Sequence, residues 1–256
     1  MVTKSPQKKS RIYWLPNAIT TCGLFSGFYA IVQAMNLDFE LAAIAIFIAL
    51  FFDMLDGRVA RITRTESAFG AEYDSLSDMV AFGAAPALIL YEWALKKLGE
   101  LGWFAAFVYC VCAALRLARF NTTKDMSEKD FFQGLPSPAA AGLLAGLVWT
   151  MEVYSFPFDY LGWIAWGLTL FTGASMVSNF KYYSGKNIDI RKAVPFWVVV
   201  LIAFLIITGF QITDNLPELL FIFFLIYAVS GYLRPFFGLL RWRSWKNHDQ
   251  DRRNSD

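Results

Sequence analysis

The sequence predicts an all-α integral membrane protein, a polytopic bundle of about eight transmembrane helices. Of the 256 residues, 57% are hydrophobic and 17% are charged, whereas soluble domains contain roughly 45–50% apolar and about 25% charged residues. The apolar residues are concentrated in nearly uncharged stretches such as 17–35, 79–95 and 193–210. Because a bilayer core of about 30 Å requires a helix of roughly 20 apolar residues, these stretches have the length of membrane spans. The composition excludes a soluble enzyme, a secreted disulfide scaffold and a disordered chain.

Eight hydrophobic segments follow one another along the chain, separated by turn residues and charged loops. We expect three parts: a basic segment over 1–15, a transmembrane domain over 16–240 and a charged tail over 241–256. Within the transmembrane domain, the predicted helices are 16–35, 40–64, 71–96, 101–121, 136–154, 158–180, 192–210 and 216–239.

The distribution of charges predicts how the bundle is oriented. If the N-terminus is cytosolic, every Lys and Arg except Lys96 and Lys97 falls on the cytosolic side of the predicted helices. Cytosolic loops of membrane proteins carry an excess of Lys and Arg. Since an even number of spans returns the chain to the side on which it started, both termini are expected in the cytosol.

Histidine and cysteine are too scarce to supply the chemistry of a site. His248 is the single histidine and lies in the polar tail, which excludes a Ser-His-Asp triad and a His-ligated zinc site. Cys22, Cys110 and Cys112 lie in apolar segments without a C-x-x-C pair, and we interpret them as core residues. Any reaction must therefore use carboxylates, Lys or Arg, hydroxyls or backbone groups.

Four aspartates interrupt the second and third predicted helices. Asp53 and Asp56 lie three residues apart in FFDMLDGRVAR, and Asp74 and Asp78 lie four residues apart in GAEYDSLSDMV. These spacings place each pair on one helix face, and the short link makes the two helices antiparallel neighbours. A carboxylate costs about 2.5–3.5 kcal/mol near a bilayer centre, so the four converging acids require partners.

Divalent metal ions are the partners that fit this acidic cluster best. Mg²⁺ and Mn²⁺ prefer oxygen ligands, and two ions about 3.5–4 Å apart are typical of phosphoryl chemistry. Gly57 and Ala60 leave space on the acidic face, where Arg61 offers a bidentate phosphate contact. The alternative is that the acids only pair with Arg58, Arg61 and Arg64, which leaves one acid over and does not explain the small residues.

The acidic segment resembles the signature of the CDP-alcohol phosphotransferase family, D-x2-D-G-x2-A-R-x7–8-G-x3-D-x3-D. Further stretches between residues 15 and 142, LPNAITTCGLFSGFYAIV, DSLSDMVAFGAAPA, RLARFNT and GLPSPAAAG, resemble those family members whose acceptor alcohol is L-serine. The signature positions are all present, at Asp53, Asp56, Gly57, Ala60, Arg61, Gly70, Asp74 and Asp78.

The resemblance implies transfer of the phosphatidyl group from CDP-diacylglycerol to the hydroxyl of L-serine, which yields phosphatidylserine and CMP. It implies a homodimer in a prokaryotic inner membrane, with membrane lipids and no nucleic acid as partners and a site facing the cytosol. Asp78 would be the general base. The resemblance also implies two Mg²⁺ or Mn²⁺ ions held by Asp53, Asp56, Asp74 and Asp78, and a CDP site formed by Asn17, Gly57, Ala60, Arg61 and Gly70.

Basic residues at the cytosolic end of the fourth predicted helix are candidates for binding the acceptor. A zwitterionic amino acid requires a cation for its carboxylate, and Arg116 and Arg119 lie there with Asn121 beside them. We expect these three residues to bind serine or the lipid phosphate. The alternative is that the two arginines are anchors that reach lipid headgroups.

Three other functions remain open. The same family signature is compatible with glycerol phosphate, inositol or inositol phosphate as acceptor. An intramembrane prenyltransferase also uses aspartates and Mg²⁺, but its two acidic motifs lie far apart in sequence, whereas here both pairs fall within residues 53–78. An ion-coupled transporter would place acids near the midplane on discontinuous helices, often with internal repeats.

Overall fold

A computed structural model describes residues 14–63, 65, 67–123, 131–154, 160–183 and 215–232. The described chain is helical except for two three-residue strands, which pair antiparallel and join Phe131 to Tyr183 and Gln133 to Lys181. The elements are α1 (Trp14–Met35), α2 (Phe39–Ile62), α3 (Ala68–Asp78), the π-helical turn η1 (Met79–Ala84), α4 (Ala85–Trp93), the 3₁₀ turn η2 (Leu95–Leu98), α5 (Glu100–Thr123), β1 (Phe131–Gln133), α6 (Ser137–Tyr154), α7 (Leu161–Val177), β2 (Lys181–Tyr183) and a last helix, Leu216–Tyr232.

The all-α class is confirmed, and most predicted helices agree with the observed ones to within a few residues. The predicted helix 71–96 differs most, because it consists of α3, η1 and α4 in succession and ends in the 3₁₀ turn η2. The predicted helix 192–210, Arg64 and the charged tail lie outside the described residues. By length and composition, two described helices could cross a membrane: Trp14–Met35 and Glu100–Thr122, with mean hydropathies of 1.4 and 1.8.

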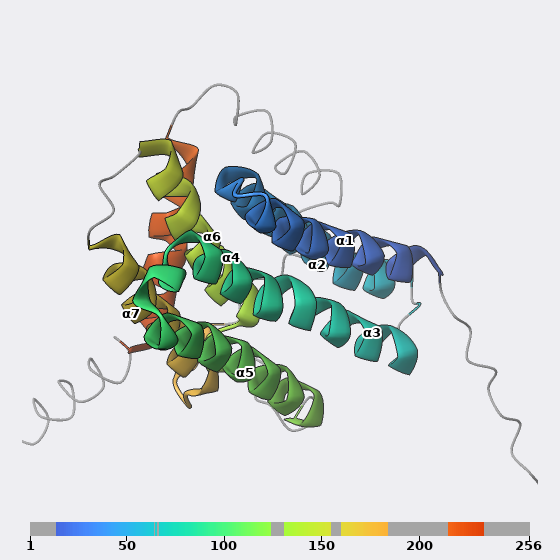
Figure 1. Ribbon diagram of the computed structural model, residues 1–256. Helices are drawn as coiled ribbons and strands as arrows, with labels where there is room; N and C mark the ends of the chain where they lie inside the picture. Colours follow the sequence, from blue (N-terminus) through green and yellow to red (C-terminus); the bar gives the residue numbers. More distant parts are fainter. Residues whose placement is uncertain are drawn as a thin grey trace, which may run out of the picture.

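The first helices form two layers, and the candidate site lies where these layers meet. Figure 1 shows α1 and α2 side by side, with the near-continuous helix α3–η1–α4 between them and α5. Asp38 caps the start of α2 by accepting from Leu41 N–H at 3.1 Å, and Ser67 caps α3 by accepting from Gly70 N–H at 3.0 Å. Helix α3 thus begins a few residues after α2 ends.

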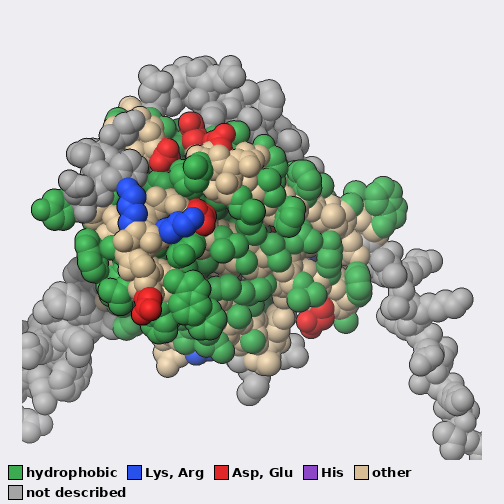
Figure 2. Space-filling view, viewed as in Figure 1, with side chains coloured by type: hydrophobic (Ala, Val, Ile, Leu, Met, Phe, Trp, Pro, Cys, Tyr) green, Lys and Arg blue, Asp and Glu red, His purple; other side chains and the backbone are tan. Residues whose placement is uncertain are grey.

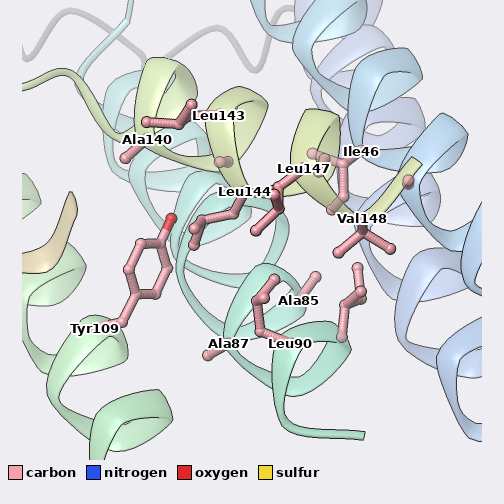
Figure 3. Packing of buried hydrophobic residues seen from close by; sticks show 14 of the residues in the cluster. Ile46, Ala85, Ala87, Leu90, Tyr109, Ala140, Leu143, Leu144, Leu147 and Val148 are labelled. Carbon is pink, nitrogen blue, oxygen red and sulfur yellow. The ribbon is translucent and has the colours of Figure 1, made fainter. Parts of the chain in front are cut away.

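Helix α6 lies at the centre of the hydrophobic core. Every residue from Ala139 to Thr150 is buried, which is the pattern of a helix surrounded by others on all sides. Figure 3 shows Leu144, Leu147 and Val148 of α6 packed between Ile46 of α2 and the small residues of α4. This core fixes α2, which carries Asp53 and Asp56, relative to α4, which continues the helix that carries Asp74 and Asp78.

Much of the surface is apolar. Figure 2 shows one face covered largely by hydrophobic side chains, with few charged ones. Phe25 and Phe28 of α1 and Trp103, Phe104 and Phe107 of α5 are more than half exposed. Contiguous exposed aromatic and aliphatic side chains suit contact with lipid, where no water is available to make their exposure unfavourable.

The closest helix contact in this region requires glycine at position 27. A Cβ built on Gly27 of α1 would lie 2.6 Å from the Cα of Ala81 in η1, and such a backbone neighbour cannot move aside cheaply. Glycine therefore allows α1 to approach the π-helical turn.

Replacing Gly27 by alanine tests this contact. Gly27→Ala is expected to lower the free energy of unfolding by about 1–3 kcal/mol, the usual cost of overpacking. Gly167→Ala is the matched control, since nothing lies within 4 Å of its Cβ position; it should raise stability by about 0.5–1 kcal/mol. Thermal unfolding of both purified variants in detergent measures the difference, and equal effects would contradict the close contact.

Candidate metal and nucleotide site

Three of the predicted metal ligands come together between α2 and α3. Asp53, Asp56 and Asp74 each offer a carboxylate oxygen, and these oxygens lie within 4.8 Å of one another. Asp56 is 6% exposed. Neither Asp53 nor Asp56 forms a salt bridge with Arg58 or Arg61 in the described part of the chain, so pairing with these arginines does not explain these two acids.

Asp78 lies on the inner side of this group. It is the last residue of α3, and its carboxyl group lies close to that of Asp53. All four aspartates line a small cavity, here called the inner cavity, which has room for about one water molecule and whose walls include Gly23, Ala49 and Ala81. Small residues on α1, α2 and η1 thus leave a narrow space next to four oxygen-bearing side chains.

A threonine of α1 orients the most buried acid. The hydroxyl of Thr20 lies 2.7 Å from Oδ2 of Asp56 and donates to it, and also lies 3.1 Å from the carbonyl of Pro16. Ser77 in turn donates to the backbone carbonyl of Thr20 at 3.2 Å. These contacts connect α1 to both acid-bearing helices and hold the Asp56 carboxylate in one direction, as outer hydrogen bonds do for metal ligands.

A second, larger cavity of about 400 Å³ adjoins the first, and we call it the outer cavity. Thr20, Asp56 and Asp74 line both cavities. The outer cavity is also lined by every residue that the resemblance assigned to CDP: Asn17, Gly57, Ala60, Arg61 and Gly70.

The walls of the outer cavity combine the exposed backbone of two glycines with the positively charged side chain of an arginine. A Cβ on Gly57 would meet nothing nearer than the guanidinium of Arg61 at 3.8 Å, so Arg61 lies over the backbone that the glycine leaves uncovered. A Cβ on Gly70 would lie 3.4 Å from the side-chain oxygen of Asn17. The N-terminal turn of α3, with Ser67 at its cap, faces the same cavity; helix N-termini and arginine both favour phosphate groups.

Of the three residues predicted to bind the acceptor, one lies beside the aspartates. Arg116 of α5 interacts electrostatically with Asp78 and Asp53, and its Nη1 donates to the hydroxyl of Ser137 at 2.6 Å. Tyr227 of the last helix also lies near this guanidinium.

The other two residues bind neighbouring helices. Arg119 donates to the carbonyl of Val177 at 3.1 Å and to the side chain of Asn179 at 3.4 Å, at the end of α7. Asn121 donates to the hydroxyl of Ser75 in α3 at 2.9 Å. Both therefore hold α5 against its neighbours near the site.

The donor set fits a hard divalent ion. Carboxylate oxygens at this spacing are the ligands that Mg²⁺ and Mn²⁺ prefer, and a hydroxyl already orients one of them. Repulsion between the carboxylates favours a bound cation at their centre. An adjoining cavity of nucleotide size with an arginine in its wall then allows a phosphorylated ligand to reach that centre.

Sequence reasoning missed Thr20 as part of the site, although the signal was present. In the stretch P-N-x-x-T, Asn17 and Thr20 are three residues apart and share a helix face. Once Asn17 was assigned to the cavity, the same face required Thr20. Ser137 and Tyr227 carried no comparable signal, because their helices are distant in sequence from the aspartates.

An acidic cluster set between two cavities in an apolar helical bundle is the arrangement of an intramembrane centre for metal-dependent phosphoryl chemistry. The chain belongs to the CDP-alcohol phosphatidyltransferase family, whose sequence model matches residues 13–174. The family is membrane-bound, and this agrees with the apolar surface and the two long apolar helices.

Two of the relatives align over about nine-tenths of the chain, and a third aligns over about half of it. The chain is 34% identical over 230 residues to the CDP-diacylglycerol–serine O-phosphatidyltransferase of Helicobacter pylori, which covers 90% of this chain and 94% of that protein. The protein of the same name from Methanocaldococcus jannaschii is 34% identical over 224 residues, which cover 88% of this chain and 95% of that protein. The one from Mycobacterium tuberculosis is 42% identical over 139 residues, which cover 52% of this chain and 48% of that protein.

The Thr20 hydrogen bond predicts a specific loss of metal affinity. Thr20→Val keeps the shape but removes the donor to Asp56, and we expect about tenfold weaker Mn²⁺ binding, at the lower end of the range for such partners. Thr21→Val is the matched control, because Thr21 bonds Asn17 and Tyr73 and lines neither cavity. Calorimetric titration with Mn²⁺ measures both, and equal affinities would reject the role of Thr20.

Proposed function

We propose that this protein transfers the phosphatidyl group of CDP-diacylglycerol to the hydroxyl of L-serine, releasing CMP and phosphatidylserine. The observation that carries the proposal is the junction of the two cavities at Thr20, Asp56 and Asp74, which joins a nucleotide-sized space to a four-carboxylate centre. The serine acceptor is supported by the names of relatives that align over about nine-tenths of the chain.

The proposed setting is a prokaryotic inner membrane, crossed eight times with both termini in the cytosol. The charge distribution supports this orientation, because only Lys96 and Lys97 would lie outside. The site then faces the cytosol near the membrane surface. Such a position lets the acyl chains of the lipid substrate stay in the bilayer while the CDP group and serine reach the site from water.

The outer cavity holds the CDP group in this proposal. Arg61 binds a phosphate oxygen, while Gly57, Ala60 and Gly70 let the nucleotide approach the backbone and Asn17 contacts it from α1. Mg²⁺ or Mn²⁺, as two ions on Asp53, Asp56, Asp74 and Asp78, supplies Lewis-acid neutralisation of the diphosphate and of the departing CMP when bound.

Asp78 is the proposed general base. Its carboxylate takes the proton of the serine hydroxyl as the serine oxygen forms a bond to the phosphorus that carries diacylglycerol. The bond from that phosphorus to the bridging oxygen breaks, and CMP leaves with this oxygen. Asp78 suits the role because it lines the inner cavity but not the outer one, so CDP does not cover it.

Arg116 is the proposed partner of the serine carboxylate. It lies beside Asp78, so one arginine can hold the amino acid while its hydroxyl faces the base. Ser137 fixes the guanidinium by a hydrogen bond. Arg119 and Asn121 contribute indirectly in this proposal, by keeping α5 in place against α7 and α3.

The central prediction is serine-dependent release of CMP. Purified protein in detergent with CDP-diacylglycerol and Mg²⁺ or Mn²⁺ should release CMP when L-serine is added, and chelation of the metal should abolish the release. Glycerol phosphate, inositol and inositol phosphate, tested in parallel, should give little. CMP release that is independent of serine, or faster with another alcohol, would overturn the proposed acceptor.

The different roles of the aspartates predict different losses of activity and of metal binding in their variants. Asp53→Asn and Asp74→Asn should abolish turnover and weaken Mn²⁺ binding, because each removes a metal ligand. Asp78→Asn should lower kcat by about 10²–10⁴-fold, the usual contribution of a general base, while CDP-diacylglycerol binding stays close to that of the unmodified protein. CMP release and equilibrium binding of CDP-diacylglycerol measure the two effects; normal serine transfer by Asp78→Asn would reject the base.

A further inference from the structure

The helix that carries Asp78 changes its winding directly after that residue. The π-helical turn η1 covers Met79–Ala84, and Ala85 N–H donates to the carbonyl of Val80, five residues back. Each residue of a helix turns it by about 100°, so the extra residue in this turn resets the direction in which α3 faces relative to α4. π-helical turns inside α-helices are uncommon and occur often at functional sites.

A proline explains why the turn forms here. Pro86 follows η1 at the start of α4. Proline has no N–H, and its ring clashes with the carbonyl four residues earlier, which is that of Phe82. The α-helical partner of the Phe82 carbonyl is therefore lost, and the helix opens at this point.

Tyr109 of α5 binds the carbonyl that Pro86 displaces. Its side chain is completely buried, and its hydroxyl donates to the carbonyl of Phe82 at 3.0 Å. The turn is also confined by α1, because Gly27 lies against Ala81. Between these two contacts the π-helical turn has little freedom to move.

The same helix that binds the turn also reaches Asp78. Arg116 lies seven residues after Tyr109, two turns along one face of α5, and interacts with Asp78 and Asp53. Helix α5 thus acts on the segment of Asp78 at two points: the charge of Arg116 acts on the carboxylate, and Tyr109 donates to the carbonyl four residues beyond it.

We propose that Tyr109 is a positioning residue for Asp78, and that it acts by holding the π-helical turn opened by Pro86. The inference rests on the proposed function, in which Asp78 is the base. The Tyr109 hydroxyl touches no substrate; it sets the direction in which α3 presents Asp78 to the serine hydroxyl. The expected consequence of losing it is slower chemistry with unchanged binding of CDP-diacylglycerol and metal.

The first test compares two buried tyrosines, one that binds the π-helical turn and one that lies elsewhere in the fold. Tyr109→Phe and Tyr182→Phe each remove one hydroxyl from a fully buried ring, and Tyr182 donates to the carbonyl of Ala228 at 3.1 Å, away from η1. Both variants should lower the melting temperature by similar amounts. Only Tyr109→Phe should lower kcat for serine-dependent CMP release, by about tenfold, since small misplacements of a reacting group reduce rates this strongly.

The second test restores the missing donor. Pro86→Ala lets residue 86 donate to Phe82, so the helix can close into regular α-helix; the melting temperature should rise while kcat falls about tenfold, as for any misplaced reacting group. A substitution that only damaged the structure would lower both the melting temperature and kcat. Tyr109→Phe added to Pro86→Ala should then reduce kcat no further, because both changes act on one turn.

The outcomes separate the inference from the proposed function. If the unmodified protein releases no CMP in response to serine, the proposed function fails. If it does, and Tyr109→Phe retains the same kcat or loses no more than Tyr182→Phe, the positioning role is rejected. A kcat of Pro86→Ala equal to that of the unmodified protein rejects it as well, even if Tyr109→Phe does not fold.

Discussion

Repulsion between carboxylates in an apolar surrounding dominates the energetics of the site. Three acids with oxygens within 4.8 Å of one another and a fourth close to Asp53 are unfavourable unless cations and donors compensate them. Thr20 supplies a donor to Asp56, and Arg116 supplies a positive charge beside Asp53 and Asp78. Without a bound cation this arrangement of carboxylates is unfavourable. The same arrangement favours binding of a divalent ion and a phosphorylated ligand.

Close helix packing makes this concentration of charge possible. Gly27 allows α1 to lie close against Ala81 in the π-helical turn that directly follows Asp78. Gly23 and Ala49 lie in the wall of the inner cavity, so small residues also leave the space in which a ligand can sit. Packing and chemistry therefore depend on the same short side chains, which restricts substitution here more than in an ordinary core.

The acidic centre could be predicted from sequence because it depends on local spacing. Asp53 and Asp56, or Asp74 and Asp78, share a face in any regular helix. The electrostatic interaction of Arg116 with Asp78 and the hydrogen bonds of Arg119 to the end of α7 depend on how α5 is rotated. The sequence periodicity of a helix that is apolar all round does not define this rotation. The π-helical turn was missed because it arises from Pro86 together with Tyr109 of another helix.

The two cavities divide the acids into two pairs with different surroundings. Asp56 and Asp74 face both cavities, whereas Asp53 and Asp78 line only the inner one and lie next to Arg116. In the proposed reaction, the first pair therefore faces the CDP group and the second faces serine. A displacement at phosphorus requires the attacking and the leaving oxygen on roughly opposite sides, and a site divided in this way supplies a separate position for each. The direction of Asp78 then matters more than its mere presence, because Asp78 is the proposed base and lines the inner cavity alone.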